Sequence, residues 1–427
     1  MGTRFLYTLL LYLLVPHALW HLVWRARRQP AYLKRIPERF GHYQEKRGTP
    51  IIWIHAVSVG ETRAAETLVR ALQKEYPSHS ILITHMTPTG RETGERLFGE
   101  SVLRCYLPYD LPGAVARFLD RFRPSIGVLM ETELWPNLIH ACKERAIPLY
   151  LINARLSEKS HARYRRFPKL VRASLQDLTA VAAQSAGDAE RLTALGARNA
   201  RITGNLKFDI SPPEPLLALG GTWRERYGPG RAVLLAASTR EGEEEMLLAG
   251  LQAFDVAGLL LVVVPRHPQR FDEVAALIER YGLRYQRRST GAAIAADTRV
   301  VLGDSMGEMF AYYAACDVAF VGGSLLPFGG QNLIEPCAVG KPVLFGPYTY
   351  NFSEAAENAV AAGAALRVSN VDELMHEAKR LLRDAAAARR MEAASIQFVE
   401  AHQGATQRVL ELLRWEIPTP SPPRPSP

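Results

Sequence analysis

The chain has 427 residues, more than one hydrophobic core usually serves, so two domains are expected. Its 48% hydrophobic and 22% charged residues are typical of a globular protein and exclude a disordered chain or a multi-span membrane protein. The formal net charge is +9, and the four cysteines are scattered with no Cys-x-x-Cys pair. This cysteine usage disfavours a disulfide framework or a cysteine zinc site and favours a reducing, cytosolic location.

Much of the positive charge lies near the N-terminus, where residues 1–50 contain nine Lys or Arg and two acids. Nucleic-acid binding is one interpretation of such a cluster, but most of these bases follow the apolar segment FLYTLLLYLLVPHALWHLVW, which is 20 residues long. That length is enough to cross a bilayer as a helix, and the segment lacks a signal-peptide cleavage site. The basic flank then predicts a cytoplasmic location against anionic lipid and no nucleic-acid partner. Because Pro16, His17 and His21 weaken a spanning helix, an interfacial helix in the membrane surface stays open.

After this segment, short apolar runs alternate with amphipathic ones, a pattern that predicts a parallel sheet covered by helices on both faces. The stretch FDISPPEPLLALGG interrupts the pattern and is interpreted as a linker, after which a second alternating series begins. We therefore expect two doubly wound α/β domains that face one another, with ligands bound at the strand C-termini in the cleft. The expected order is an anchor helix (1–24), a basic membrane-proximal segment (25–50), a first domain (51–210), a linker (211–230), a second domain (231–414) and a disordered Pro-rich tail (415–427).

The predicted elements follow this order. Helices are expected over 61–75, 111–122 and 136–145, and a last helical stretch runs from 384 to about 415. Strands are expected in the first domain at 51–57, 81–86, 126–130, 148–152 and 179–183, and in the second at 232–237, 259–264, 298–303, 318–321, 342–345 and 364–368.

Carboxylates follow two of the predicted strands of the first domain. Glu61 stands in IIWIHAVSVGET, where the first strand meets a helix N-terminus. One interpretation is a first-turn acid that complements the helix dipole, although Ser58 or Thr62 would cap the helix without placing an acid at the rim of a cleft. The stretch VLMETELWPNL repeats the arrangement with Glu131 and Glu133. Two such strand ends in one domain indicate a polar site, and simple helix capping remains the alternative.

Four stretches of the second domain place polar residues or glycines at the ends of predicted strands. AASTREGEEE offers backbone amides at Ser238 and Thr239 for an anion, and VVVPRHP offers Arg266, whose guanidinium suits a phosphate. Each stretch is a weak signal alone, but together they indicate a nucleotide site. The other two supply Met306, Gly307 and Glu308 at a helix start, Gly322 and Gly323 where a ligand can approach the backbone, and Asn332 with Glu335 on one helical face.

The sequence motifs of several enzyme classes are absent from this chain. The chain has no G-x-x-x-x-G-K-[ST] phosphate loop, no G-x-G-x-x-G after the first strand and no H-E-x-x-H or compact carboxylate cluster. ATPases, dinucleotide oxidoreductases and metalloenzymes are therefore disfavoured, and no cofactor is expected. The dispersed His55, His85 and His267 are interpreted as structural.

Nine stretches, in order and at similar spacing up to about residue 414, resemble the 3-deoxy-D-manno-octulosonic acid (Kdo) transferases of lipopolysaccharide assembly: HAVSVGET, THMTPTG, LPYDLP, METELWPNLI, NARLS, GNLKFD, VPRHP, FVGGSL and QNLIEP. The resemblance implies a GT-B glycosyltransferase on the cytoplasmic face of the inner membrane. It would move Kdo from CMP-Kdo to a tetraacylated lipid A precursor without a catalytic metal. The chain departs from the pattern at Pro327, at Phe328 and in its Pro-rich tail.

The resemblance also implies roles for individual residues. Glu61 would be the proton acceptor, and Glu131 and Lys207 would stabilise the transition state. The implied contacts with CMP are Pro265, Arg266, Met306, Gly307, Glu308, Asn332, Leu333, Ile334 and Glu335.

These residues suggest a mechanism. A sugar hydroxyl is a poor nucleophile, so a carboxylate must take its proton during attack, and the helix N-terminus is expected to keep Glu61 ionised. Backbone amides and Arg266 would stabilise the departing phosphate from the other domain, and no second nucleophile is evident, so single displacement with inversion is expected. The bases from Arg155 to Arg172 either pair with acceptor phosphates or membrane lipid, or form a solvated helix face. A nucleotide-sugar epimerase and a non-catalytic, membrane-tethered nucleotide-sugar-binding protein are the alternative functions.

Overall fold

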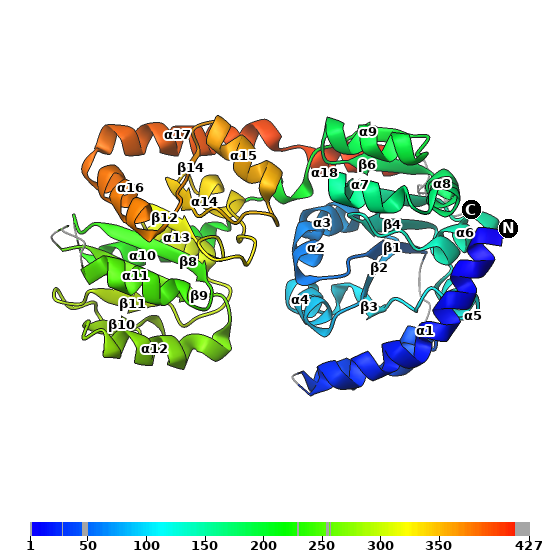
Figure 1. Cartoon of the computed structure of the whole chain (residues 1–427), viewed down its shortest axis with the longest axis horizontal. Helices are drawn as coiled ribbons and strands as arrows, with labels where there is room; N and C mark the ends of the chain where they lie inside the picture. Colours follow the sequence, from blue (N-terminus) through cyan, green and yellow to red (C-terminus); the bar gives the residue numbers. More distant parts are fainter. Residues whose placement is uncertain are drawn as a thin grey trace, which may run out of the picture. The chain divides into compact units, whose positions relative to one another are not determined.

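The computed structural model describes residues 2–27, 29–44, 50–228, 230–252, 256 and 258–414. Contacts within the chain divide it into two units. Unit 1 comprises Met1–Asp209 together with the segment that begins at Gln403, and unit 2 comprises Ile210–His402 (Figure 1). The tail predicted over 415–427 lies outside the described residues.

Unit 1 is built on a parallel sheet with the strand order β3-β2-β1-β4-β5-β6-β7 in the described part of the chain. All five strands predicted for this domain form, because their apolar runs are buried between two helical layers. The edge strands β3 and β7 were not predicted, since they are short and only partly buried. The strands are β1 Ile51–His55, β2 Ser80–His85, β3 Leu103–Tyr106, β4 Ile126–Met130, β5 Leu149–Ala154, β6 Ala180–Ala183 and β7 Ala200–Ile202.

Unit 2 repeats this plan with the order β10-β11-β9-β8-β12-β13-β14, again with parallel pairs. Its six predicted strands form, and the partly buried edge strand β10 is the addition. The strands are β8 Val233–Thr239, β9 Leu260–Pro265, β10 Tyr285–Arg287, β11 Val300–Leu302, β12 Val318–Val321, β13 Val343–Phe345 and β14 Ala365–Arg367.

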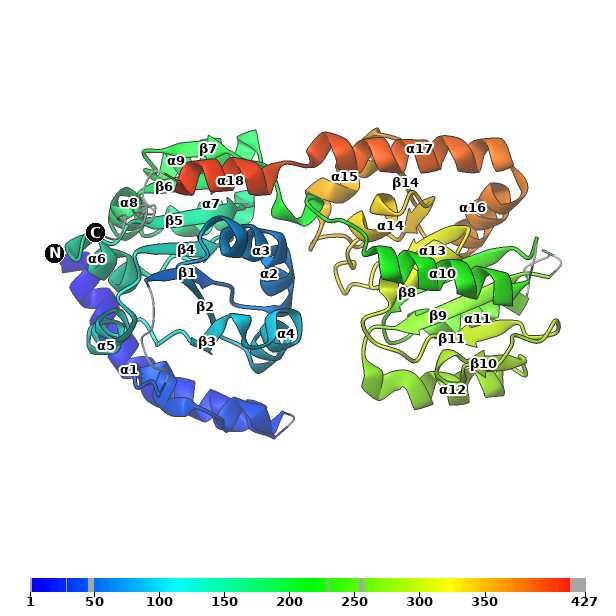
Figure 2. The same ribbon diagram turned by 180° about the vertical axis from the view of Figure 1, so that it is seen from behind.

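Helices cover both faces of each sheet (Figure 2). Along β1, Ile52 and Ile54 join one buried apolar cluster while Ile51 and Trp53 join another, as a doubly wound sheet requires. The single helix predicted over 61–75 is two, α2 and α3, which meet at Ala65. Unit 1 contains α1 Gly2–Ala26, α2 Val59–Ala64, α3 Glu66–Glu75, α4 Pro88–Phe98, α5 Pro112–Phe122, α6 Pro136–Glu144, α7 Glu158–Tyr164, α8 Pro168–Asp177, α9 Ala186–Leu195 and α18 Ala405–Leu413; unit 2 contains α10 Glu214–Tyr227, α11 Glu243–Gln252, α12 Phe271–Arg280, α13 Met309–Ala315, α14 Ile334–Ala338, α15 Ser353–Ala361, α16 Val371–Arg383 and α17 Ala385–His402.

The linker predicted over 211–230 is instead the helix α10 of unit 2. Pro213 is its N-cap, and Pro215 lies in its first turn, where a missing N–H costs nothing. At Gly220 a Cβ atom would come within 2.5 Å of the Ala311 carbonyl oxygen of α13, so glycine is required for the close approach of the two helices. The prolines and glycines therefore begin a helix and let it pack, rather than marking a flexible connection.

The end of the second domain was also predicted wrongly. The last helical stretch breaks at Gln403, and α18 returns to unit 1, where Ala405, Val409 and Leu413 are buried in a core cluster with β1 and β2 residues. The carboxylate of Asp209 caps this helix, because it accepts the backbone N–H groups of Gly404 (2.6 Å), Ala405 (3.3 Å) and Thr406.

Part of the predicted basic segment belongs to the body of unit 1. Arg39 is only 2% exposed; its guanidinium stacks 4.2 Å from the centre of the Tyr106 ring and donates to the Met86 carbonyl oxygen. Glu38, beside it, accepts the backbone N–H of Tyr106 at 2.8 Å. Arg39 is therefore a core residue and does not face lipid.

Candidate functional site

In each unit the strand order reverses between two neighbouring strands, β1 and β4 in unit 1 and β8 and β12 in unit 2. Open parallel sheets bind their ligands beyond the strand C-termini at this point. Glu61 follows β1 and Glu131 follows β4, and these strands pair in register, with His55 opposite Leu129. The two predicted carboxylates of unit 1 thus emerge together at its switch point.

Glu61 lies in the first turn of α2 and is 7% exposed. Its carboxylate accepts the Val57 backbone N–H (2.7 Å to Oε2) and the Ser58 hydroxyl (2.9 Å to Oε1). Ser58 is the N-cap of the helix, and its oxygen accepts the Glu61 N–H at 3.5 Å. This reciprocal arrangement is a variant of the capping box, so Glu61 does have the helix-capping position that the sequence left as an alternative.

The acid–base state of Glu61 differs from the expectation. Burial raises the pKa of Glu61 to about 8, helped by the negative charges of Glu131 and Glu133 and opposed by its hydrogen bonds to Val57 and Ser58. The prediction that the helix N-terminus keeps this group ionised is therefore wrong, because desolvation and two neighbouring acids outweigh the favourable groups. A pKa near neutrality suits a group that takes up and returns protons.

Glu131 is held in an unusual backbone conformation, with φ of +56°, in the left-handed region that non-glycine residues rarely occupy. Its carboxylate Oε1 lies 3.2 Å from Nζ of Lys207. Both side chains are partly exposed, so this ion pair stabilises the fold little and chiefly fixes orientation. Lys207, distant in sequence, thereby lies beside Glu131.

Asn153 was missed as a site residue. It lies in β5 with φ of +51°, and its side-chain oxygen accepts the Leu206 backbone N–H at 3.0 Å. This bond positions the short helix η4 (Leu206–Phe208), which carries Lys207. The signal was the Asn of NARLS beside the end of a predicted strand, since asparagine tolerates the left-handed region.

The histidines of unit 1 have structural positions, as predicted. Burial lowers the pKa of His55 to about 3 and that of His85 to about 4. Nδ1 of His55 lies 2.9 Å from the Thr84 hydroxyl, and Nδ1 of His85 lies 2.9 Å from the Ala56 carbonyl oxygen. Across the described part of the chain, no group of three or more His, Cys, Asp or Glu side chains has a metal-binding arrangement.

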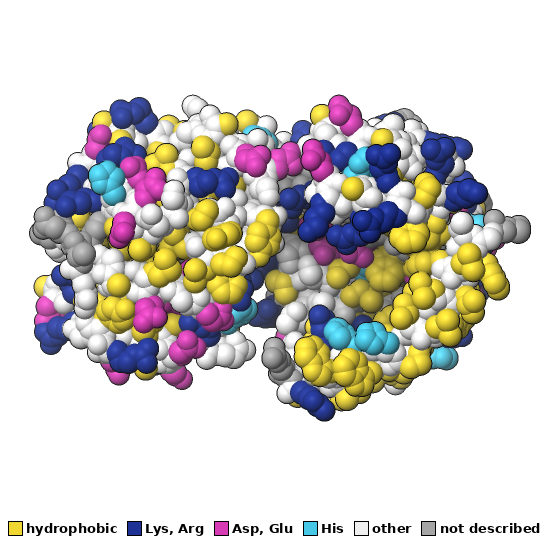
Figure 3. Space-filling model, viewed as in Figure 1, with side chains coloured by type: hydrophobic (Ala, Val, Ile, Leu, Met, Phe, Trp, Pro, Cys, Tyr) yellow, Lys and Arg dark blue, Asp and Glu magenta, His cyan; other side chains and the backbone are white. Residues whose placement is uncertain are grey.

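Exposed bases follow the predicted polar site along the chain. This face of unit 1 is hollowed between hydrophobic side chains that gather on α1 and a band of Lys and Arg side chains (Figure 3). The exposed bases on and between α7 and α8 are Lys159, Arg163, Arg165, Arg166, Lys169 and Arg172.

The predicted CMP contacts follow three strands of unit 2. Pro265 ends β9, Arg266 follows it, and the Arg266 N–H donates to the Thr239 carbonyl oxygen at 3.0 Å. Burial raises the pKa of Tyr313; the charge of Glu335 raises it further and that of Arg266 lowers it, so both charges act on this one tyrosine. The remaining predicted contacts lie between β11 and α13 (Met306, Gly307, Glu308) and at the start of α14 (Asn332, Leu333, Ile334, Glu335).

Several of these side chains are held in place by neighbours. Glu308 stands at the N-terminus of α13, and its carboxylate pairs with Arg288 at 3.0 Å. Asn332 donates its amide to Glu335 (3.2 Å) and accepts the Ile334 N–H (3.1 Å). Glu308 and Glu335 are thus held beyond the C-terminal ends of the strands, where they can accept hydrogen bonds from a ligand's hydroxyl groups.

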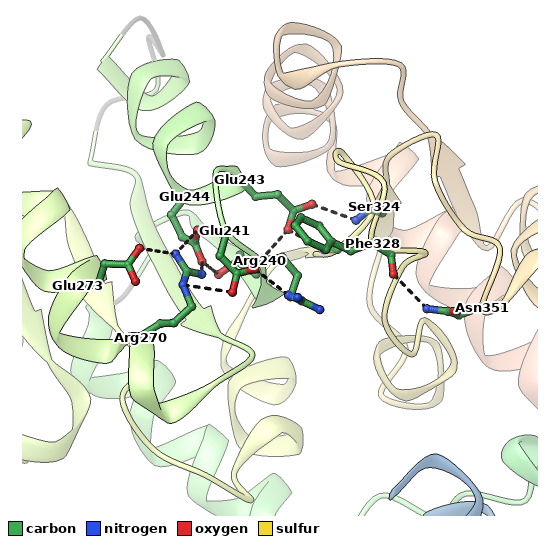
Figure 4. A network of polar contacts seen from close by, with 11 residues as sticks. Arg240, Glu241, Glu243, Glu244, Arg270, Glu273, Ser324, Phe328 and Asn351 are labelled. Atoms are coloured by element: carbon green, nitrogen blue, oxygen red, sulfur yellow. Dashed lines mark hydrogen bonds and ion pairs between the residues drawn. The ribbon is translucent and has the colours of Figure 1, made fainter. Parts of the chain in front are cut away.

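A network of buried acids organises the switch point of unit 2 (Figure 4). Glu243 is fully buried, and its carboxylate accepts four backbone N–H groups, from Arg240 (2.9 Å), Gly323 (2.6 Å), Ser324 (2.9 Å) and Leu325 (3.0 Å). No function was predicted for Glu243, because an acid in the first turn of a helix needs no explanation beyond the helix dipole.

Glu244 points to the opposite side of α11 (Figure 4). It binds Arg270 through both carboxylate oxygens (2.7 and 3.2 Å) and accepts the Thr239 hydroxyl at 2.7 Å. The two adjacent acids therefore tie the end of β8 to the loops after β9 and β12.

This network corrects one expectation, that a ligand approaches the backbone at Gly322 and Gly323, because the amides at 323–325 already donate to Glu243. The Thr239 hydroxyl is used by Glu244. A Cβ atom at Gly322 would lie 2.7 Å from Cα of Thr239, so Gly322 is needed for close approach of the protein's own backbone. These groups shape the loop, and the backbone amides of Ser238 and Thr239 together with Arg266 stay the predicted phosphate partners.

The loop that contains Pro327 and Phe328, where the chain departs from the family pattern, is also held by contacts with neighbouring side chains. The guanidinium of Arg240 stacks 4.3 Å from the centre of the Phe328 ring. The Tyr350 hydroxyl donates to the Pro327 carbonyl oxygen (2.8 Å), and the Asn351 amide donates to that of Phe328 (3.2 Å). Pro327 and Phe328 therefore pack within unit 2.

Comparison with known proteins connects this geometry to a family. Residues 34–210 match the family described as 3-Deoxy-D-manno-octulosonic-acid transferase (kdotransferase), and residues 279–398 match Glycosyl transferases group 1. The chain is 44% identical to a 3-deoxy-D-manno-octulosonic acid transferase of Bordetella pertussis and 40% identical to one of Haemophilus influenzae, in each case over 96% of this chain and 98% of the relative. A solved glycosyltransferase structure from Rickettsia africae shares the fold, with a TM-score of 0.59 at 14% identity over 88% of this chain and 99% of that one.

The raised pKa of Glu61 has a consequence for stability. A carboxyl whose pKa is about 8 when folded and 4.5 when unfolded stabilises the fold fully below pH 4.5, and this contribution is lost as pH rises towards 8. Glu61→Gln removes the titration; its amide oxygen can still accept the Val57 N–H, while its amide nitrogen can only donate to the Ser58 hydroxyl oxygen. By urea denaturation we expect the mutant to be more stable than wild type near pH 8, by on the order of 1–3 kcal/mol, with a smaller difference at acidic pH. A mutant that is less stable at pH 8 would instead assign Glu61 to the helix dipole alone.

The four amides bound by Glu243 predict the effect of Glu243→Gln. The amide nitrogen of glutamine cannot accept N–H groups, so at least one pair of these bonds must break. We expect hydrogen exchange at 323–325 to become about tenfold faster or more, and CMP affinity measured by calorimetry to fall. Glu245→Gln, at an exposed position on the same helix, is the matched control and should change neither. Unaltered exchange in Glu243→Gln would contradict the assignment.

Proposed function

The chain belongs to the 3-deoxy-D-manno-octulosonic acid (Kdo) transferases, and on that basis we propose that it transfers Kdo from CMP-Kdo to a tetraacylated lipid A precursor with inversion at the anomeric carbon. Unit 2 would bind the nucleotide of the donor, and unit 1 would supply the groups that activate the acceptor. The reaction contributes to lipopolysaccharide assembly.

The observation that carries the proposal is the pair of carboxylates at the switch point of unit 1. Glu61 and Glu131 come from neighbouring strand ends and interact electrostatically, and the pKa of Glu61 is raised to about 8. General bases are most effective when their pKa lies near the working pH. A purely structural acid gains nothing from this arrangement, since each charge destabilises the other.

Glu61 would act as the base. The acceptor hydroxyl hydrogen-bonds to its carboxylate and gives up its proton as the hydroxyl oxygen attacks the anomeric carbon of Kdo. The bond from that carbon to the CMP phosphate breaks in the same displacement, and CMP leaves with the bonding electrons. Because Lys207 already pairs with Glu131 at 3.2 Å, Glu131 is a poor candidate for a second nucleophile, which supports a single displacement.

Glu131, Lys207 and Arg266 would stabilise charges that develop in the transition state. Positive charge grows on the sugar ring as the donor bond breaks, and the fixed Glu131 carboxylate favours it. Negative charge grows on the departing phosphate, for which the guanidinium of Arg266 is the suitable partner. Glu308 and Glu335 would accept hydrogen bonds from hydroxyl groups of the donor.

The membrane is part of the proposal because the acceptor is a lipid. By length and composition α1 could cross a membrane. We place the protein on the cytoplasmic face of the inner membrane, with Arg25, Arg27, Lys34 and Arg35 exposed towards anionic headgroups. The bases of α7 and α8 would bind the phosphates of the acceptor.

Incubation with CMP-Kdo and lipid A precursor, followed by mass spectrometry, tests the proposal. We expect the acceptor mass to increase by one or more Kdo units and CMP to be released. The number of increments gives the number of sugars transferred. No increment would overturn the transferase proposal, and conversion of the donor sugar in the absence of acceptor would indicate an epimerase.

The base assignment predicts both the rate and the pH profile. We expect Glu61→Gln to lower turnover by roughly 10²–10⁴-fold, while CMP affinity, a property of unit 2, stays near wild type. For wild type, kcat/KM should rise with pH and level off above about 8, as Glu61 loses its proton. Because the charge of Glu131 raises the pKa of Glu61, Glu131→Gln should move this inflection to lower pH. Near-normal turnover in Glu61→Gln would show that Glu61 is not the base.

A further inference from the structure

One face of α1 is less exposed than the other along the length of the helix. The less exposed residues recur every three or four positions, which is the spacing of a single helical face. The helix packs on α6, on α8 and on η1 (Pro30–Leu33). The residues of this docked face are Arg4, Tyr7, Thr8, Leu11, Val15, Ala18, Leu19, His21, Leu22 and Ala26.

Hydrogen bonds hold the N-terminal end of the docked face, and its C-terminal end is buried. Near the N-terminal end, the Tyr7 hydroxyl donates to Asp110 (3.0 Å) and the Thr8 hydroxyl donates to the Asn137 side-chain oxygen (3.1 Å). Asp110 is buried and also accepts the backbone N–H groups at the start of α6, so Tyr7 binds a fixed partner. At the other end, Leu22 and Ala26 are buried, 6% and 9% exposed.

The opposite face of α1 is apolar and uncovered. Figure 3 shows these hydrophobic side chains gathered along the edge of unit 1. Leu13, at the middle of the helix, is 70% exposed, and Trp20 is 61% exposed. Bases stand beside this face at the C-terminal end, where Arg25 and Arg27 are exposed. An apolar face with basic and aromatic residues matches a surface of anionic lipid. The remaining large exposed residues of this face are Phe5, Leu6, Leu9, Leu10, Tyr12, Leu14, Val23 and Trp24.

These contacts are incompatible with a helix that crosses the bilayer. From Tyr7 to Ala26 the helix rises about 28 Å, close to the hydrocarbon thickness of a membrane, roughly 30 Å. A crossing helix would therefore hold Tyr7 and Ala26 on opposite sides of the membrane. Yet Tyr7 bonds to Asp110 of unit 1, and Ala26 leads through η1 to Arg39, which is buried in the same unit. We infer that α1 lies in the plane of the membrane surface, docked on unit 1 by one face and inserted in lipid by the other. The inference rests on the proposed membrane function.

The energetic comparison favours this arrangement. Crossing would transfer the docked face from protein to lipid, which exchanges one apolar surrounding for another and gains little. It would also break the bonds of Tyr7 and Thr8 and uncover Leu22. Hydropathy cannot distinguish a crossing helix from an in-plane one, because both require about 20 apolar residues. The pattern of contacts with unit 1 does distinguish them.

Depth-dependent fluorescence quenching tests the inference on the full chain. The four native cysteines are buried, so a cysteine introduced at Leu13→Cys can be labelled selectively with an environment-sensitive fluorophore. In anionic vesicles we expect the strongest quenching from lipids brominated near the headgroup end of the acyl chain. Strongest quenching by lipids brominated near the chain terminus would place the helix midpoint at the bilayer centre and overturn the inference. Absence of quenching by either lipid would also overturn the inference. The exposed face of α1 would then lie in solvent or against a second copy of the chain, and not in lipid.

Accessibility to a membrane-impermeant maleimide gives an independent measurement. Thr3→Cys and Gln44→Cys, both at exposed positions, should be labelled in inverted inner-membrane vesicles and protected in spheroplasts. A crossing helix would reverse the pattern for Thr3→Cys and leave Gln44→Cys, the matched control, unchanged. Kdo transfer is measured in the same vesicles. Activity combined with a reversed Thr3→Cys pattern would retain the proposed function and reject the in-plane helix.

Discussion

In a sheet of parallel strands, every strand delivers the residues that follow it to the same edge, and both units are built on this constraint. It places Glu61 beside Glu131, although 69 residues lie between them in the sequence. In unit 2 it brings Pro265, Glu308 and Glu335 to one edge of the sheet. Helix α2 begins directly after β1, so the backbone that ends a strand also starts a helix at the site. The remaining features of the two sites adjust side chains that this topology has already placed.

Buried carboxylates make most of these adjustments, and their surroundings give them different properties. Glu243 accepts four backbone N–H groups, which oppose the rise in its pKa that burial causes, and it serves to shape a loop. Glu61 accepts one backbone N–H and one hydroxyl, and it faces two other acids. The same functional group therefore shapes a loop in unit 2 and is a titratable group at the candidate site of unit 1. The number of donors and the nearby charges decide between the two.

The sequence predicted those parts of the fold that depend on local pattern. Buried strands were found because both of their faces are apolar, whereas β3, β7 and β10 were missed because edge strands lack that pattern. The positions of Glu61 and Glu131 followed from parallel topology, but the direction of the Glu61 pKa shift did not, since desolvation depends on packing of the whole domain. Asn153 and Glu243 were missed for a related reason: each acts on a segment far away in sequence, and a residue pattern does not show that partner. The linker assigned over 211–230 was wrong because Pro213 and Gly220 are explained by the packing of α10 on α13.

The return of α18 to unit 1 has a consequence for the order in which the protein is made. A ribosome releases the strands of unit 1 first, then all of unit 2, and only then the residues that complete the core around Ala405 and Val409. Until that point one apolar face of unit 1 lacks its cover, and Asp209 has none of the three amides that it binds in the finished molecule. Unit 1 therefore cannot reach its final form during synthesis, while unit 2, which is continuous in sequence, can. The first unit to emerge is the last to be completed.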